Sequence, residues 1–150
     1  MNYWTQPFWL NPYDGRIKQE VVTNAHYIHE EIKDKFLPTY YAFIMEHGFN
    51  SIINLFASDC KCTLDGQEFS GSENLRNKFA TLKAKRLIYR NIKSTSQAVN
   101  DTTILITASG TITPLFEHLY GGDIKFTETF VLKNTNSIFV VSNYILASNT

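Results

Sequence analysis

The sequence predicts an α+β domain with its helices first and an antiparallel meander last. One observation is a helical stripe of apolar residues over residues 17–36. Another is a series of turn signals between β-prone runs, at residues 65–66, 100–101 and 134–137. Helices followed by a run of strands indicate α+β rather than alternating βα units. A chain of 150 residues is long enough for one domain with its own core.

Residues 1–16 are rich in aromatic and turn-forming residues. We expect either an arm that packs on its own domain or on a second subunit, or a recognition segment for a partner. The helix that follows has apolar residues at spacings of three and four, namely Ile17, Val21, Ala25, Ile28, Ile32 and Phe36. His26, His29 and Glu30 are expected on its exposed polar face.

Pro38 favours either the first turn of a new helix, over residues 37–47, or a kink, because proline lacks a backbone donor. Gly48 is expected to end that helix. A short helix over residues 51–57 should follow, with Asn50 as its N-cap.

Asp65-Gly66 between short β-prone runs predicts a tight hairpin. Ser70 and Glu73 have the spacing of a capping box and predict the start of another helix. One face of this helix should carry three apolar residues, Leu75, Phe79 and Leu82.

Two long strands are predicted over residues 87–99 and 102–113, followed by a connection over residues 114–123 and a hairpin over residues 126–146. Alternation assigns one face of this hairpin to Phe126, Phe130, Leu132, Ile138, Val140, Tyr144 and Leu146. The opposite face is assigned to Val131, Phe139, Val141 and Ile145. Because both faces are apolar, we expect helices to cover one face and a second subunit to cover the other.

The chain has a formal net charge of zero and a pI of about 6.9, which argues against binding mainly to nucleic acid or anionic lipid. Cys60 and Cys62 should point to the same side of a strand, as buried thiols of a reducing compartment. No apolar run approaches the ~20 residues that span a bilayer, and residues 1–10 lack a basic signal region. A soluble protein of the cytoplasm or nucleus is expected, with no cofactor, no metal and no membrane partner.

Over about residues 36–146 the chain resembles the nuclear transport factor 2-like family. The resemblance is carried by the motifs FLPTYY, LFASDC, DGQEFSG, FTETFVLKNTN and VVSN, in this order. It implies a cone in which a curved antiparallel sheet wraps around N-terminal helices, and a homodimer formed through the outer sheet face. Residues 1–35 would then be an extension and residues 36–150 the domain.

The resemblance implies three functional classes. In the carrier of GDP-bound Ran, a small GTPase, acidic residues hold the partner, and their counterparts are Asp65 and, on a longer loop, Glu117 and Asp123. In the scaffold branch, Phe-containing peptides dock in a groove, and its positions correspond to Phe36, Phe56 and Leu146.

The related isomerases and dehydratases need an acid or base inside the cone. Tyr40 resembles their oxyanion-donor tyrosine, but Leu64 stands at the position of their general base. His118 and Glu128 are the remaining candidates. We therefore expect a non-catalytic homodimer that binds protein segments in nucleocytoplasmic transport or RNA-linked assembly. Its dimer face would include Val131, Phe139, Val141 and Ile145.

Overall fold

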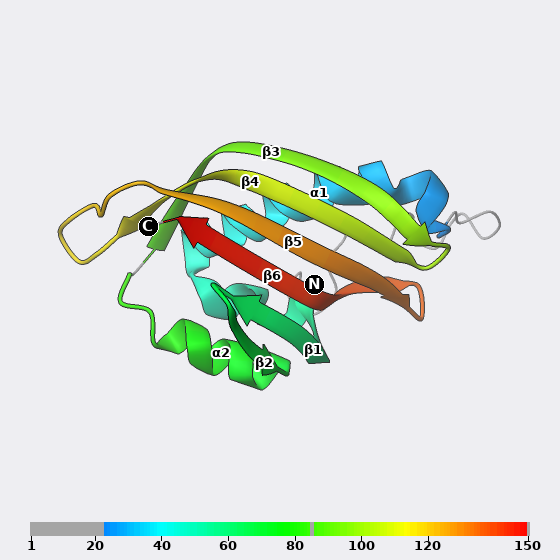
Figure 1. Ribbon diagram of the computed structural model, residues 1–150, viewed down its shortest axis with the longest axis horizontal. Coiled ribbons are helices and arrows are strands. Elements are labelled where there is room, and N and C mark those ends of the chain that lie inside the picture. The colour runs from blue at the N-terminus through cyan, green and yellow to red at the C-terminus, as the bar shows by residue number, and fades with distance from the viewer. Residues whose placement is uncertain (1–22, 85, 150) are drawn as a thin grey trace.

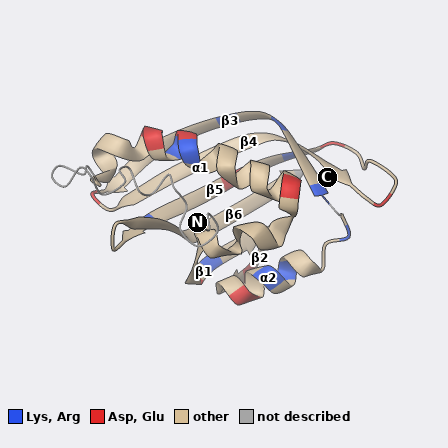
Figure 2. Ribbon diagram, turned by 180° about the vertical axis from the view of Figure 1, so that it is seen from behind, with Lys and Arg blue, Asp and Glu red and all other residues tan. Residues whose placement is uncertain are grey.

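The computed structural model describes residues 23–84 and 86–149, and it has the α+β architecture that the sequence predicts. The helical segments are α1 (Ala25–His47), the 3-10 helix η2 (Phe49–Leu55) and α2 (Ser72–Ala80). The strands are β1 (Phe56–Leu64), β2 (Gln67–Ser70), β3 (Arg86–Asn100), β4 (Thr103–Leu115), β5 (Ile124–Thr135) and β6 (Ile138–Asn149). The six strands form one curved sheet (Figure 1), and α1 and α2 lie on the same side of it (Figure 2).

Helix α1 is continuous across Pro38, so the separate helix expected over residues 37–47 is wrong. The Asn24 side chain accepts a hydrogen bond of 2.9 Å from the backbone N–H of His26 and caps the helix at its start. The expected boundary between residues 35 and 36 therefore falls inside α1. The aromatic arm and the start of the predicted helix, over residues 17–22, lie outside the described residues. None of the helices in the described part of the chain is long and apolar enough to cross a membrane.

The segment between α1 and β3 follows the predicted order, with local differences. Residues 49–55 form a 3-10 helix rather than an α-helix, and Gly48 precedes it in place of the expected Asn50 cap. Helix α2 starts after Gly71 without a side-chain cap, so the capping box predicted from Ser70 is wrong. Leu82 lies beyond the end of α2 and is 46% exposed, so it does not share the buried helix face expected for it.

The three predicted hairpins are confirmed. The turn between β1 and β2 has positive φ at Asp65 and Gly66, and the turn between β5 and β6 has positive φ at Asn136 and Ser137, as tight hairpin turns require. The strand order is β2-β1-β6-β5-β4-β3. The sheet is mixed rather than purely antiparallel, because β1 runs parallel to β6.

A register shift in the pairing of β5 with β6 changes which β6 side chains face the helices. Val131 pairs with Asn143, whereas its neighbour Leu132 pairs with Val141, so β6 contains an extra residue there. Phe139 and Val141 therefore point into the core, where they are 5% and 0% exposed. Their assignment to the dimer face is wrong, since simple alternation does not hold across a bulge.

Candidate functional site

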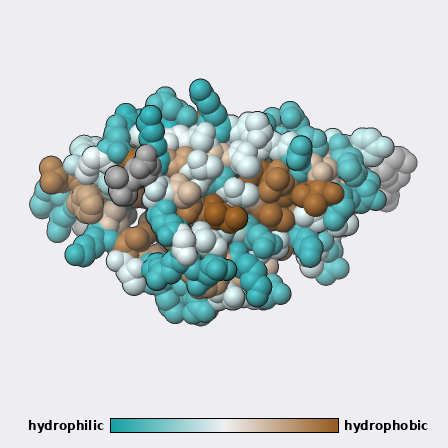
Figure 3. All heavy atoms as spheres, in the orientation of Figure 1, coloured by the Kyte–Doolittle hydropathy of each residue, from teal (hydrophilic) through white to brown (hydrophobic). Residues whose placement is uncertain are grey.

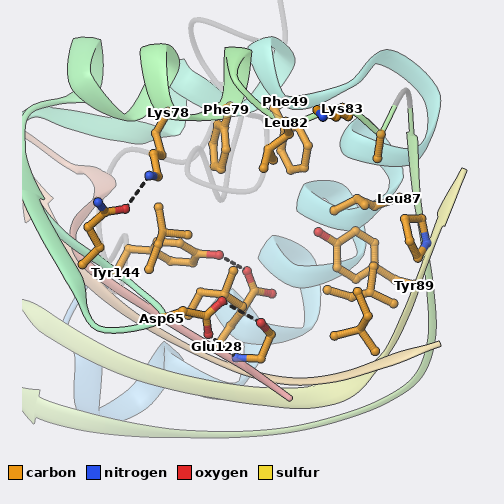
Figure 4. A pocket seen from close by; sticks show the side chains of 18 of the residues that line it. Phe49, Asp65, Lys78, Phe79, Leu82, Lys83, Leu87, Tyr89, Glu128 and Tyr144 are labelled. Carbon is orange, nitrogen blue, oxygen red and sulfur yellow. Dashed lines mark hydrogen bonds between the residues drawn. The ribbon is translucent and has the colours of Figure 1, made fainter. Parts of the chain in front are cut away.

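A cavity of about 780 Å³ lies between the concave face of the sheet and the helical segments (Figure 4). Apolar side chains from η2, from α2 and the residues after it, and from the strands form most of its wall, including Phe49, Phe79, Leu82, Leu87, Ile112 and Leu146. This volume is in the range of small-molecule pockets and is large enough for an aromatic side chain. The mouth carries polar groups, among them Asp65, Gln67, Lys78 and Lys83.

Glu128, near the middle of β5, is the buried carboxyl group of this cavity, and its side chain is 1% exposed. The Tyr41 hydroxyl donates a hydrogen bond of 2.8 Å to Oε1, and the Tyr144 hydroxyl donates one to Oε2. The pKa of Glu128 is raised from 4.5 to about 7, because the effect of burial outweighs the two tyrosine hydrogen bonds, which lower the pKa. The carboxyl group therefore changes between its neutral and ionised forms near neutral pH.

Burial likewise raises the pKa of the surrounding phenols, Tyr40, Tyr41, Tyr89 and Tyr144, and the neighbouring Glu128 charge raises it further. These groups stay neutral and serve as hydrogen-bond donors or acceptors. Tyr41 comes from α1, Tyr89 from β3 and Tyr144 from β6. The cluster around Glu128 therefore joins the long helix to strands on either side of β5.

At the mouth, Asp65 connects the β1–β2 turn to the end of β6. Its carboxylate accepts hydrogen bonds of 2.6 Å from both the backbone N–H and the hydroxyl of Ser148. The Asp65 backbone N–H donates to the carbonyl oxygen of Leu146 at 2.8 Å. Gln67, which follows the same turn, accepts a hydrogen bond from the Lys78 ammonium of α2. Asp65 is thus a structural residue of the mouth as well as an exposed charge.

The three residues expected to line a peptide groove do not lie together on a surface. Phe36 and Phe56 are 1% and 5% exposed, and their rings pack in the core, against Phe130 and Tyr144 respectively. They are core residues because α1, which carries Phe36, packs against the sheet, and Phe56 at the start of β1 faces α1 near Tyr40. Leu146 lies on the cavity wall beside Asp65.

The loop after β4 carries the other candidates. Glu117 and His118 are exposed, and neither they nor Asp123 are among the described residues that line the cavity. Asp123 accepts a hydrogen bond of 2.7 Å from the Thr113 hydroxyl and pairs with Arg90 at 2.9 Å. The Thr113 hydrogen bond and the Arg90 charge lower the pKa of Asp123. The three acidic residues expected to hold a GTPase partner therefore do not lie together. Asp65 is at the cavity mouth, whereas Glu117 and Asp123 are on this loop.

The outer face of the sheet carries a band of apolar residues (Figure 3). By strand register, the outward side chains of β4, β5 and β6 include Leu105, Val131, Ile138, Val140 and Ile145. Ile145 is 49% exposed. Val131 and Ile145 thus lie on the outer face as expected, while Ile138 and Val140 replace Phe139 and Val141 there.

A sequence model of the nuclear transport factor 2 (NTF2) domain matches residues 32–148. This chain belongs to the NTF2 family. Among curated proteins no sequence match is found. Within the described residues of this NTF2-family protein, no group of three His, Cys, Asp or Glu side chains is placed to hold a metal ion.

Solved structures share the fold at low sequence identity. Ntf2 from Cryptosporidium parvum matches with a TM-score of 0.69 and 20% identity, over 81% of this chain and 95% of that chain. Yeast Bre5, a Ubp3-associated protein, matches with a TM-score of 0.60 and 24% identity, over 81% and 96%. A scytalone dehydratase-like protein from Novosphingobium aromaticivorans matches with a TM-score of 0.69 and 9% identity, over 83% and 86%. The NTF2 fold therefore hosts both enzymes and non-enzymes.

The sequence identified Glu128 as a candidate but did not predict where in the fold it lies. It also did not predict that Tyr41, Tyr89 and Tyr144 surround its carboxyl group. One signal was available. Glu128 lies between Phe126 and Phe130 on the inward face of a strand, where an acidic residue needs hydrogen-bond partners. The identity of those partners required the tertiary structure.

Proposed function

We propose that this protein is a non-catalytic binding module that receives an aromatic side chain of a partner protein segment in its cavity. The observation that carries the proposal is the open cavity of about 780 Å³ with largely apolar walls. An aromatic ring buries a large apolar area when it enters such a pocket, so one side chain can anchor a whole segment. The exposed groups of the mouth, Asp65, Gln67 and Lys83, can then contact the flanking backbone.

The relatives support a role in protein binding. Yeast Bre5 has been solved as a cofactor in complex with the deubiquitinase Ubp3, and it shares this fold. We extend the proposal to nucleocytoplasmic transport or RNA-linked assembly in the cytoplasm or nucleus, following the family resemblance.

The proposal includes a homodimer formed through the outer sheet face. Its central side chains, Val131, Val140 and Ile145, are apolar in a position where a water-exposed sheet face normally carries polar residues. A contiguous apolar patch on a folded surface is typical of an interaction site. A second copy of the chain offers the same patch, as a two-fold symmetric interface requires.

A matched pair of surface variants tests the cavity. Leu82 lies at the mouth and is 46% exposed, whereas Val99, near the end of β3, is 58% exposed and does not line the cavity. Peptides selected from a random display library on the wild-type protein should share an aromatic residue. Leu82→Glu should weaken their binding about tenfold, while Val99→Glu leaves it unchanged. Enrichment without aromatic residues, or equal binding to both variants, would contradict the proposal.

A second candidate function is acid–base catalysis on a small molecule, and one observation favours it. Glu128 is a buried carboxyl group in a cavity, with a pKa raised to about 7. A neutral carboxylic acid there could donate a hydrogen bond to a substrate oxygen. Turnover of small ketones or hydroxylated aromatics by the wild type, abolished in Glu128→Gln, would support catalysis. Equal rates in the two proteins would count against it.

A further inference from the structure

We propose that the cavity selects an aromatic side chain that carries a hydroxyl group, a tyrosine of the partner rather than a phenylalanine, because the hydroxyl reaches the Glu128 carboxyl group. This inference rests on the proposed function and specifies its ligand. Glu128 comes from the concave face of β5 and lies beside the Tyr144 hydroxyl at the end of the cavity opposite Phe79 and Leu82 (Figure 4).

The polar groups of the cavity differ in their exposure. Asp65, Gln67 and Lys83 are exposed at the mouth, whereas Glu128 is almost completely buried. The rest of the wall is mainly apolar, with Leu87, Ile112 and Leu146 from three different strands. The complementary ligand is therefore mostly apolar and carries a polar group where it meets Glu128.

The hydrogen-bonding capacity of Glu128 is not exhausted by its protein partners. A carboxylate offers about four acceptor positions on its two oxygens. The Tyr41 and Tyr144 hydroxyls each use one of them. A hydrocarbon end placed against the carboxyl group would cover the remaining positions without satisfying them, which costs free energy. A ligand hydroxyl satisfies one of them, and it can also accept a hydrogen bond when Glu128 is protonated.

The charges at the site favour a neutral hydroxyl over an anionic group. Glu128 itself carries the negative charge in its ionised form, and the side chains near it are phenols, Tyr40 and Tyr89 among them. A ligand carboxylate or phosphate at this depth would be repelled by ionised Glu128. A phenol avoids this penalty and still buries an aromatic ring.

The test compares p-cresol with toluene, which are the side-chain analogues of tyrosine and phenylalanine. Binding of each is measured by titration of the full chain in NMR spectra. The wild type should bind p-cresol about tenfold more tightly than toluene. Glu128→Leu should bind both about equally, and Leu146→Val, on the wall, should weaken both by the same factor. Glu128→Gln keeps the shape of the side chain and hydrogen-bonding groups for both tyrosines, so it replaces the leucine variant if that variant does not fold. Its preference for p-cresol over toluene should be smaller than that of the wild type.

The outcomes separate this inference from the proposed function. Equal binding of the two probes by the wild type would overturn the hydroxyl preference while leaving an aromatic-binding cavity. Binding of neither probe would overturn both. A preference for p-cresol that is retained in Glu128→Leu would show that the hydroxyl does not reach Glu128. N-acetyltyrosinamide tests whether the hydroxyl belongs to a tyrosine of a protein chain or to a free phenol. Binding at least as tight as that of p-cresol supports a partner tyrosine. Failure of N-acetyltyrosinamide to bind would overturn that assignment in favour of a free phenol.

Discussion

The buried carboxyl group of Glu128 should make the stability of the protein depend on pH in an unusual direction. Burial raises its pKa from 4.5 to about 7 in the folded state. The folded protein therefore holds this proton more tightly than the unfolded chain does. The stabilising contribution is fully present below pH 4.5 and is lost as the pH rises through about 7.

The size of the effect follows from the two pKa values. At about 1.4 kcal/mol for each pKa unit, the rise from 4.5 to about 7 corresponds to about 3 kcal/mol of unfolding free energy. The Glu128→Gln variant cannot ionise at this position, so it should not lose this contribution. Its stability relative to the wild type should therefore increase by about 3 kcal/mol between pH 4.5 and pH 8.

Urea denaturation of both proteins across this pH range measures the difference directly, because the other titrating groups are common to both. Glu68 lies exposed on β2, and Glu68→Gln is the matched control. Its stability profile should run parallel to that of the wild type. Parallel profiles for wild type and Glu128→Gln would refute the reasoning, since they would mean that ionising Glu128 costs nothing in the folded protein.

Three further predictions concern the core, the outer face and the cavity mouth. Phe56→Ala should lower the unfolding free energy by about 3–5 kcal/mol in urea denaturation; a loss below about 1 kcal/mol would contradict its place in the core. Ile145→Asp should convert a dimer to a monomer in sedimentation analysis, because it would bury a charge in the interface, and a persistent dimer would exclude this face. Asp65→Ala removes two hydrogen bonds from Ser148, so urea denaturation should show a loss of about 1–2 kcal/mol; unchanged stability would mean that these bonds contribute nothing.

Much of the fold could be predicted because its signals are local. The turn at Asp65-Gly66 and the turn at residues 134–137 are set by residues that adopt positive φ, and both hairpins form where expected. The errors have identifiable physical causes. One alternative for Pro38 was the start of a new helix, but α1 continues through it. Packing against the sheet can stabilise a helix despite an unfavourable residue.

The candidate site was less predictable than the fold. The resemblance led to Phe36 and Phe56 as groove residues, but both lie in the core. A Phe in an amphipathic pattern has the same sequence signature whether it faces a core or a groove. Asp65 and Leu146 do meet at the cavity, because β1 pairs with the end of β6.

The sequence by itself determined the order of helices and hairpins, the neutral charge and the apolar character of both faces of the last two strands. The tertiary structure decided which side chains face inward after the bulge in β6, and which partners surround Glu128. Tyr41 lies 87 positions from Glu128 along the chain and contacts it only because α1 crosses the concave face of the sheet. Turn and helix preferences act over a few residues, whereas burial and hydrogen bonding of this carboxyl group depend on contacts between distant segments.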